Sequence, residues 1–247
     1  MTSERYETEH KYRLPPTRAE RFLAATDREL SPLIYDTRRP TSYTRTTYLD
    51  TPSLAYRHSN QQSMQRRLRI REYASSLGPD DPPILTGACY LELKLSEAGR
   101  RVKTRLRATP VEIAAFIARS GHLRGINGDP SACAVLRGEL RDRAVAPRVS
   151  VWYRRRSFRR DDQRVRVTVD ADIKFADPSS PHDALGRGPE CVLEIKHFGV
   201  APDWLRDAMA SLGVPESLSK YELGMRAIEM ARTIPYRSNR PARSESA

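Results

Sequence analysis

The clearest chemical signal in the chain is the pentapeptide Arg67-Leu68-Arg69-Ile70-Arg71. As a strand it places three guanidinium groups on one face and two aliphatic side chains on the other. Guanidinium groups are planar forks of N–H donors that match phosphate oxygens. A single strand of this kind also fits an exposed sheet surface, so its meaning depends on whether other strands repeat the pattern.

Five further segments show charged side chains on one face with a period of two. They are Glu7–Arg13, Tyr90–Leu95, Val102–Arg107, Gln163–Asp170 and Val192–Lys196. Six strands of this type can bury their apolar faces under helices and turn their charged faces inward, provided that the sheet curls until it nearly closes. The pattern therefore predicts an α+β barrel with a charged, mostly basic lumen and helices packed on its outside.

The flanking segments predict the remaining elements. Pro15-Pro16 stops the first strand at about Leu14, and Thr17 is expected to cap a helix. Thr109-Pro110-x-Glu112 has the cap, the proline and the acid that begin a helix, which Gly121 ends. Further helices are expected over residues 132–143, 202–212 and 219–234, further strands over 43–49 and 149–158, and loops over 75–83, 96–100 and 177–189.

Bulk composition favours one domain with an anionic partner. The 247 residues carry a net charge of +12, mostly from arginine, which fits phosphate chains, nucleotides, nucleic acid or an acidic membrane surface. The three cysteines have no C-x-x-C spacing and an odd count, so a reduced cytoplasmic location is expected, without a disulfide framework or structural zinc. No run is long enough to span a bilayer. We expect one domain over residues 1–234 and a disordered tail over 235–247.

An ordered set of short motifs runs through residues 5–232. The motifs are Glu7-x-Glu9-x-Lys11, Thr47-Tyr48-Leu49-Asp50-Thr51-Pro52, Arg67-x-Arg69-x-Arg71, Leu91-Glu92-Leu93-Lys94, Val102-Lys103-x-Arg105, Tyr153-x-Arg155, Arg164-x-Arg166, Leu193-Glu194-Ile195-Lys196 and Ser219-Lys220-Tyr221. In this order they resemble the VTC domain, the catalytic module of polyphosphate polymerases. That domain belongs to the triphosphate tunnel metalloenzyme superfamily, together with CYTH-type triphosphatases. The resemblance implies an antiparallel, roughly eight-stranded β-barrel that forms a tunnel.

The resemblance also implies roles for individual residues, and phosphoryl transfer explains their types because it depends on positioning and on charge stabilisation. The implied catalytic phosphate ligands are Arg69, Arg71, Lys94, Arg155, Arg166 and Lys220, and further phosphate-binding candidates are Lys11, Arg67, Lys103, Arg105 and Lys196. Glu194 is the implied principal ligand of Mn²⁺ or Mg²⁺, with Glu9, Glu92 and Glu7 as candidates. Asp170 and Glu92 have an alternative role as groups that orient basic neighbours. Without the resemblance, the Glu and Lys pairs would equally fit exposed cross-strand ion pairs.

The leading hypothesis is a metal-dependent polyphosphate polymerase that transfers the γ-phosphoryl group of ATP to a polyphosphate chain. A triphosphatase or polyphosphatase of the same fold is the nearest alternative, since Glu7, Glu9 and Lys11 also fit that branch. A non-catalytic module that binds polyphosphate or RNA is a third. We expect no nucleic-acid partner, because aromatic residues make up 7% of the chain and the basic residues converge inward. A membrane-protein partner is left open.

Overall fold

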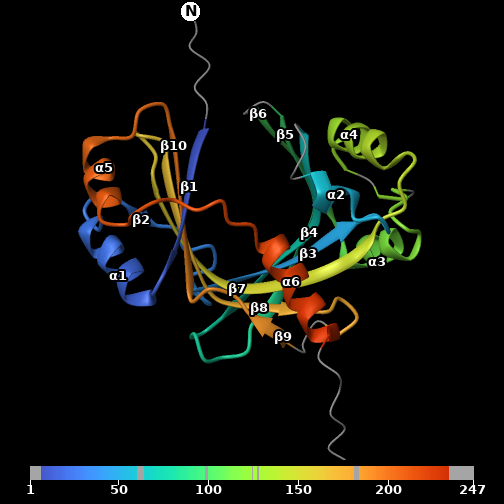
Figure 1. The fold of residues 1–247 in the computed structure, drawn as a ribbon, viewed down its shortest axis with the longest axis horizontal. Helices are drawn as coiled ribbons and strands as arrows, with labels where there is room; N and C mark the ends of the chain where they lie inside the picture. Colours follow the sequence, from blue (N-terminus) through green and yellow to red (C-terminus); the bar gives the residue numbers. More distant parts are fainter. Residues whose placement is uncertain are drawn as a thin grey trace, which may run out of the picture.

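The computed structural model describes residues 7–59, 64–97, 100–123, 125–126, 128–180 and 184–233. Runs of consecutive strands are separated by helices along this part of the chain (Figure 1). The elements are β1 (Glu7–Leu14), α1 (Pro16–Ala25), β2 (Ser31–Pro32), β3 (Thr41–Asp50), α2 (Ala55–His58), β4 (Met64–Ser76), β5 (Ile84–Glu97), β6 (Arg100–Ala108), α3 (Pro110–Ala118), α4 (Pro130–Leu140), β7 (Ala146–Arg160), β8 (Val165–Ala176), β9 (Ala184–Arg187), β10 (Cys191–Phe198), α5 (Asp203–Ala210) and α6 (Lys220–Thr233).

All strands join one antiparallel sheet. Its order is β1-β10-β8-β7-β3-β4-β5-β6, with β2 added to β7 and β9 added to β8. The sheet curls strongly, so that β1 and β10 form one wall and β4, β5 and β6 form the opposite wall (Figure 1). This architecture confirms the expected α+β fold. The barrel is not closed, however, because no ladder joins β1 to β6 among the described residues.

Two apolar clusters cover the convex face of the sheet, as the alternation predicts. Leu68 and Ile70 of β4 pack with β5 and β6 against α2, α3 and α4. Val167 of β8 and Ile195 of β10 pack with Tyr12 of β1 against α1 and α5. Apolar side chains on one face of each strand therefore fix the opposite, charged face toward the interior of the curl.

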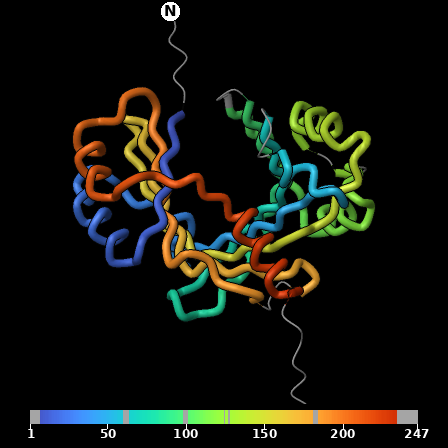
Figure 2. The backbone as a smooth tube through the Cα atoms, viewed as in Figure 1, coloured from blue at the N-terminus to red at the C-terminus, as the bar shows by residue number. Residues whose placement is uncertain are grey.

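Helix α6 differs from the other helices because it packs inside the curl (Figure 2). Tyr221, Met225 and Ile228 of α6 form a cluster with Tyr48 of β3 and Val149 of β7, on the concave face of the sheet. A Cβ atom on Gly224 would lie 2.8 Å from a Val149 methyl group, so glycine permits this close approach. The expectation that the helices all lie outside is wrong for α6.

Several predicted boundaries also need correction. The cap of α1 is Pro15, whose carbonyl accepts from the Arg18 N–H, and Thr17 lies within the helix. Arg164 has a positive φ of 51°, so β8 begins after it. The expected loop over 75–83 is shorter because β4 continues to Ser76, and the expected loop over 177–189 contains β9.

Other expectations hold or lie outside the described residues. The capping box of Thr109 and Glu112 is present, and Gly121 follows α3 with a φ of 97°. Strand β2 and helix α2 were not predicted. The centre of the expected hairpin at residues 98–99, the start of the first strand before Glu7 and the expected disordered tail at 235–247 lie outside the described residues.

Candidate functional site

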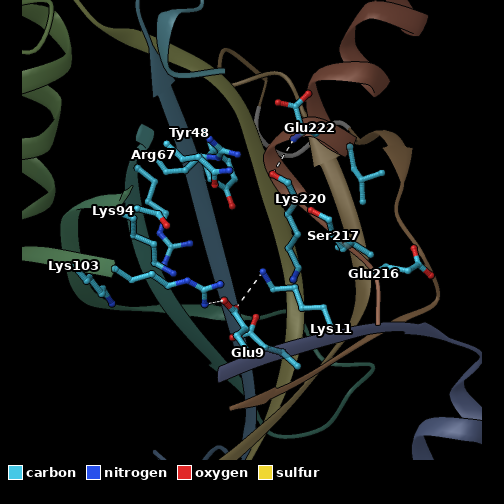
Figure 3. A pocket seen from close by; sticks show the side chains of 18 of the residues that line it. Glu9, Lys11, Tyr48, Arg67, Lys94, Lys103, Glu216, Ser217, Lys220 and Glu222 are labelled. Carbon is cyan, nitrogen blue, oxygen red and sulfur yellow. Dashed lines mark hydrogen bonds and ion pairs between the residues drawn. The ribbon is translucent and has the colours of Figure 1, made fainter. Parts of the chain in front are cut away.

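A basic cavity of about 1250 Å³ lies between the two walls of the sheet and the N-terminal end of α6 (Figure 3). Thirteen lysine and arginine side chains line it, against five glutamates, so it has a strong excess of positive charge. The basic lining residues are Lys11, Arg13, Arg57, Arg67, Arg69, Arg71, Lys94, Arg101, Lys103, Arg155, Lys196, Lys220 and Arg226. The acidic ones are Glu7, Glu9, Glu194, Glu216 and Glu222.

The three arginines of β4 line the cavity one after another, as the alternation predicts. The Arg67 guanidinium lies 5.7 Å from the centre of the Tyr221 ring on α6. Arg71 donates to the hydroxyl group of Tyr153 at 2.8 Å, and no carboxylate within ion-pair distance of it is found in the described part of the chain. Its buried Nε atom has no hydrogen-bond partner there either. The hydrogen bonds of Arg71 in this part of the chain therefore go to neutral groups, and no carboxylate is bonded to it directly.

Glu92 holds a set of cations and does not face the cavity. It is completely buried, and its carboxylate lies 2.7 Å from Arg69, 2.7 Å from Lys103 and 3.1 Å from Arg105. Burial alone would raise the pKa of this carboxyl group, but Arg69, Arg71 and Lys103 lower it well below its ordinary value. The metal-ligand role predicted for Glu92 is therefore corrected to its alternative, which is to orient basic neighbours.

Asp170 plays the same part on the opposite side of the cavity. It is completely buried, accepts two hydrogen bonds from Arg155 at 2.6 and 2.7 Å, and accepts a third from Lys220 at 2.7 Å. Burial would raise the pKa of Asp170, but the charges of Arg155 and Lys220 lower it. Lys220 is the first residue of α6, so Asp170 fixes the start of this helix at the cavity wall.

Lys94 of β5 is the basic side chain whose neighbours carry the largest excess of positive charge. It lines the cavity, and no ion pair or hydrogen bond of its side chain is found among the described residues. The charge of Arg69 and then burial lower its pKa to about 6, with Glu194 opposing and Lys196 and Arg71 adding to the shift. A lysine held among cations without an acidic partner is a favourable position for an incoming anion.

Three of the five acidic lining residues, Glu7, Glu9 and Glu194, lie on β1 and β10. In the ladder Glu9 lies opposite Lys196 and Lys11 lies opposite Glu194, so the two carboxylates are diagonal neighbours. Burial would raise the pKa of Glu9, but Lys11, Lys196 and Arg101 lower it to about 2. The pKa of Glu194 is also lowered, because cationic neighbours outweigh burial and the charge of Glu9. Both groups are therefore ionised at neutral pH.

These oxygen donors fit a hard divalent cation that shares its coordination with a phosphate chain. No group of three His, Cys, Asp or Glu side chains placed to hold a metal occurs in the described residues. Magnesium commonly binds through one or two carboxylates, with substrate phosphates and water completing the shell. Glu194 and Glu9 match such a two-carboxylate set, and Glu7, ion-paired to Lys196 at 2.8 Å, lies on the same face of β1.

Two predicted phosphate ligands lie away from the cavity. Arg166 is exposed and donates to the hydroxyl group of Tyr35 at 3.4 Å, and its ladder neighbours are the basic residues Lys196 and Arg159. Arg105 stacks on the Tyr90 ring at 3.6 Å and pairs with the buried Glu92. The role predicted for each as a lumen ligand is therefore corrected.

Sequence reasoning missed four basic residues that line the cavity, which are Arg13, Arg57, Arg101 and Arg226. Arg57 of α2 pairs with Glu222 at 3.1 Å and with Glu229, which ties α2 to α6. Arg226 comes from the second turn of α6, and Arg101 of β6 pairs with Glu9 of β1. The signal for Arg101 was its shared face with Lys103, whereas Arg57 lies on a four-residue helix with no periodic pattern.

Comparison with known proteins identifies the family. The sequence profile of the VTC domain matches residues 6–229. The chain belongs to the VTC domain family. No match to this VTC-domain protein was found among curated protein sequences. In the described part of the chain, no helix has the length and apolar character needed to cross a membrane.

Solved structures are similar to the VTC-domain protein in fold. A Bacillus halodurans protein provisionally named an adenylate cyclase has a TM-score of 0.54 at 14% identity, with 88% of this chain and 96% of that chain covered. A Vibrio parahaemolyticus protein with the same provisional name has a TM-score of 0.45 at 16% identity, with 88% and 97% covered. The first likeness shows the fold alone.

Proposed function

We propose that this VTC-domain protein is a metal-dependent phosphotransferase that transfers the γ-phosphoryl group of ATP to the end of a polyphosphate chain. The observation that carries the proposal is the excess of basic over acidic side chains lining the cavity, where neither Lys94 nor Arg71 forms an ion pair within the described residues. A triphosphate carries about four negative charges near neutral pH and would supply the missing counter-charge. Cations fixed by buried carboxylates surround this position, so little reorganisation is needed when the phosphates bind.

Each wall has its own part in the proposed reaction. Lys94, Arg69 and Arg71 bind the phosphate chain from β4 and β5, and Glu92 keeps Arg69 from turning away. Arg155 and Lys220 bind it from the other side, where Asp170 holds them side by side. Fixed cations on two sides favour the in-line approach of two phosphates and stabilise the charge that develops during transfer.

The divalent cation is proposed to lie at Glu194 and Glu9, with Glu7 close by. Bound Mn²⁺ or Mg²⁺ would neutralise phosphate oxygens and help to align the two reacting groups. The acceptor is a terminal phosphate, which already carries nucleophilic oxygens, so the reaction needs no serine, cysteine or histidine nucleophile. The three free, buried cysteines also support our proposal of a cytoplasmic location.

A hydrolase of triphosphate or short polyphosphate is the second candidate. It is favoured by Glu7, Glu9 and Lys11, which line the cavity together on β1. In this reaction water replaces the terminal phosphate as acceptor. The same cations would stabilise the transferring group, so the products distinguish the two functions.

The test is to incubate purified protein with ATP and Mn²⁺ or Mg²⁺, and to quantify ADP, free phosphate and long-chain polyphosphate. Arg155→Gln and Arg154→Gln form a matched pair, because Arg155 lines the cavity while Arg154 pairs with Asp172 outside it. Polyphosphate formed together with ADP, lost in Arg155→Gln and in Glu194→Gln and kept in Arg154→Gln, supports the polymerase. Free phosphate without polymer would replace the polymerase with the hydrolase, and tight polyphosphate binding without turnover would refute both enzymes.

A further inference from the structure

The seam between the two edge strands is bridged by an ion pair. No ladder joins β1 to β6 within the described ranges, yet Arg101 of β6 reaches Glu9 of β1. The residues are far apart in sequence and lie on opposite ends of the sheet order. Both line the cavity. Arg101 therefore contributes to holding the two walls together at the place where the barrel lacks backbone hydrogen bonds.

The two oxygens of Glu9 are each occupied by a cation. Lys11 lies 3.2 Å from Oε1, and Arg101 contacts Oε2. Glu194, in contrast, has its closest cation at 3.9 Å, the Nζ atom of Lys196. Glu9 cannot serve a divalent cation with both oxygens while Lys11 and Arg101 hold them. Metal binding at this carboxylate requires that one of the two leaves.

Of the two cations, Arg101 can leave Glu9 at the lower cost in free energy. Its side chain is 50% exposed, compared with 27% for Lys11. Half-exposed ion pairs contribute little, because water solvates the separated guanidinium well. Lys11 also lies on the same strand as Glu9 and needs no displacement across the seam. Beside Arg101 on β6, the same face carries Lys103, which lines the cavity.

We propose that Arg101 is an exchangeable lock on Glu9, which a divalent cation displaces, so that the freed guanidinium binds the phosphate chain. This rests on the proposed function, since it assumes that the cavity takes both a metal and a phosphate chain. In the absence of both, Arg101 occupies Glu9 and competes with the metal. Once released, it adds one positive charge to the phosphate site. Metal and phosphate binding then strengthen each other, and this coupling is reciprocal.

The test measures binding of Mn²⁺ and of inorganic triphosphate by calorimetry in Arg101→Gln and Arg107→Gln. Both substitutions remove one positive charge from β6, but Arg107 does not line the cavity. We expect Arg101→Gln to bind Mn²⁺ alone about fivefold more tightly than Arg107→Gln. With saturating Mn²⁺ we expect it to bind triphosphate about fivefold more weakly, and without Mn²⁺ the two variants should bind triphosphate equally.

The outcomes separate the lock from the proposed function. Equal Mn²⁺ affinities in the two variants would overturn the lock and leave metal-dependent transfer intact. A deficit in triphosphate binding that is the same with and without Mn²⁺ would also overturn it, because Arg101 would then be a permanent phosphate ligand. Absence of Mn²⁺ binding in both variants and in the parent protein would overturn the proposed metal site together with the lock.

Discussion

We predict that Lys94 makes the binding of a phosphate chain dependent on pH. In the free protein its pKa is lowered from 10.5 to about 6, chiefly by the charge of Arg69 and by burial. At pH 7.5 only about one molecule in thirty then carries a proton on Lys94. A bound phosphate chain raises the pKa toward its ordinary value, since an adjacent anion stabilises the ammonium form. Binding near pH 7.5 should therefore take up about one proton at this side chain.

The assay is calorimetric titration of inorganic triphosphate in buffers of different ionisation enthalpy, in which the slope gives the number of protons taken up. The parent protein should take up about one proton more than Lys94→Gln at pH 7.5. Its affinity should be highest below pH 6 and fall by about tenfold per pH unit as the pH rises through 7 and 8, relative to the variant. The variant corrects for titration of the ligand itself. Equal proton uptake in both proteins would refute the reasoning.

Three predictions concern stability. Glu92→Gln should lower the free energy of unfolding by about 3 kcal/mol in urea titrations, because it removes the counter-charge of buried cations. Added polyphosphate should restore part of this loss. A decrease as small as that of the exposed Asp172→Asn, which should be under about 1 kcal/mol, would contradict this. Lys94→Met should raise the melting temperature most below pH 6, because the folded parent protein must hold a protonated lysine there. The gain in melting temperature should vanish toward pH 10.5. A gain that does not depend on pH would show that protonation of Lys94 is not its cause. Tyr221→Phe removes a 2.7 Å hydrogen bond to the buried Asp50 and should cost about 2 kcal/mol, whereas an unchanged urea midpoint would show that this bond contributes nothing.

The alternation of charged and apolar residues predicted much of the fold. Leu68 and Ile70 on one face of β4 and the arginines on the other are enough to orient that strand, because a slip by one residue would bury three charges. The pattern does not say how far the sheet curls. The pairing of Arg101 with Glu9 depends on that curl, so the contact across the seam could not be read from either strand alone.

The position of α6 was missed although a signal for it exists. The spacing of Tyr221, Met225 and Ile228 shows an apolar stripe, but a stripe does not tell which face of the sheet it covers. Val149 and Val151 share the face that carries Arg155 further along β7, so part of that concave face is apolar. An apolar stretch on an otherwise charged lumen face indicates that another element of the chain packs against it from inside the curl.

Glu92 and Glu194 show a different limit of sequence reasoning. Glu92 and Glu194 lie in nearly identical Leu-Glu-(Leu or Ile)-Lys strands, so the local sequence does not distinguish the role of one carboxylate from that of the other. Three cations form ion pairs with Glu92, whereas the nearest cation to Glu194 lies 3.9 Å away. Which carboxylate is occupied depends on the neighbouring strands, and pairing of β5 with β4 and β6 is what distinguishes them.

The pairing of β1 with β10 has a consequence for the order of events during synthesis. Tyr12 of β1 lies opposite Leu193 of β10, so β1 leaves the ribosome well before the strand with which it forms a ladder. Contacts of such sequence separation form slowly, since a long loop must close before they contribute. Lys220 follows later still, on α6. A nascent chain therefore carries no assembled cavity until α6 has been synthesised.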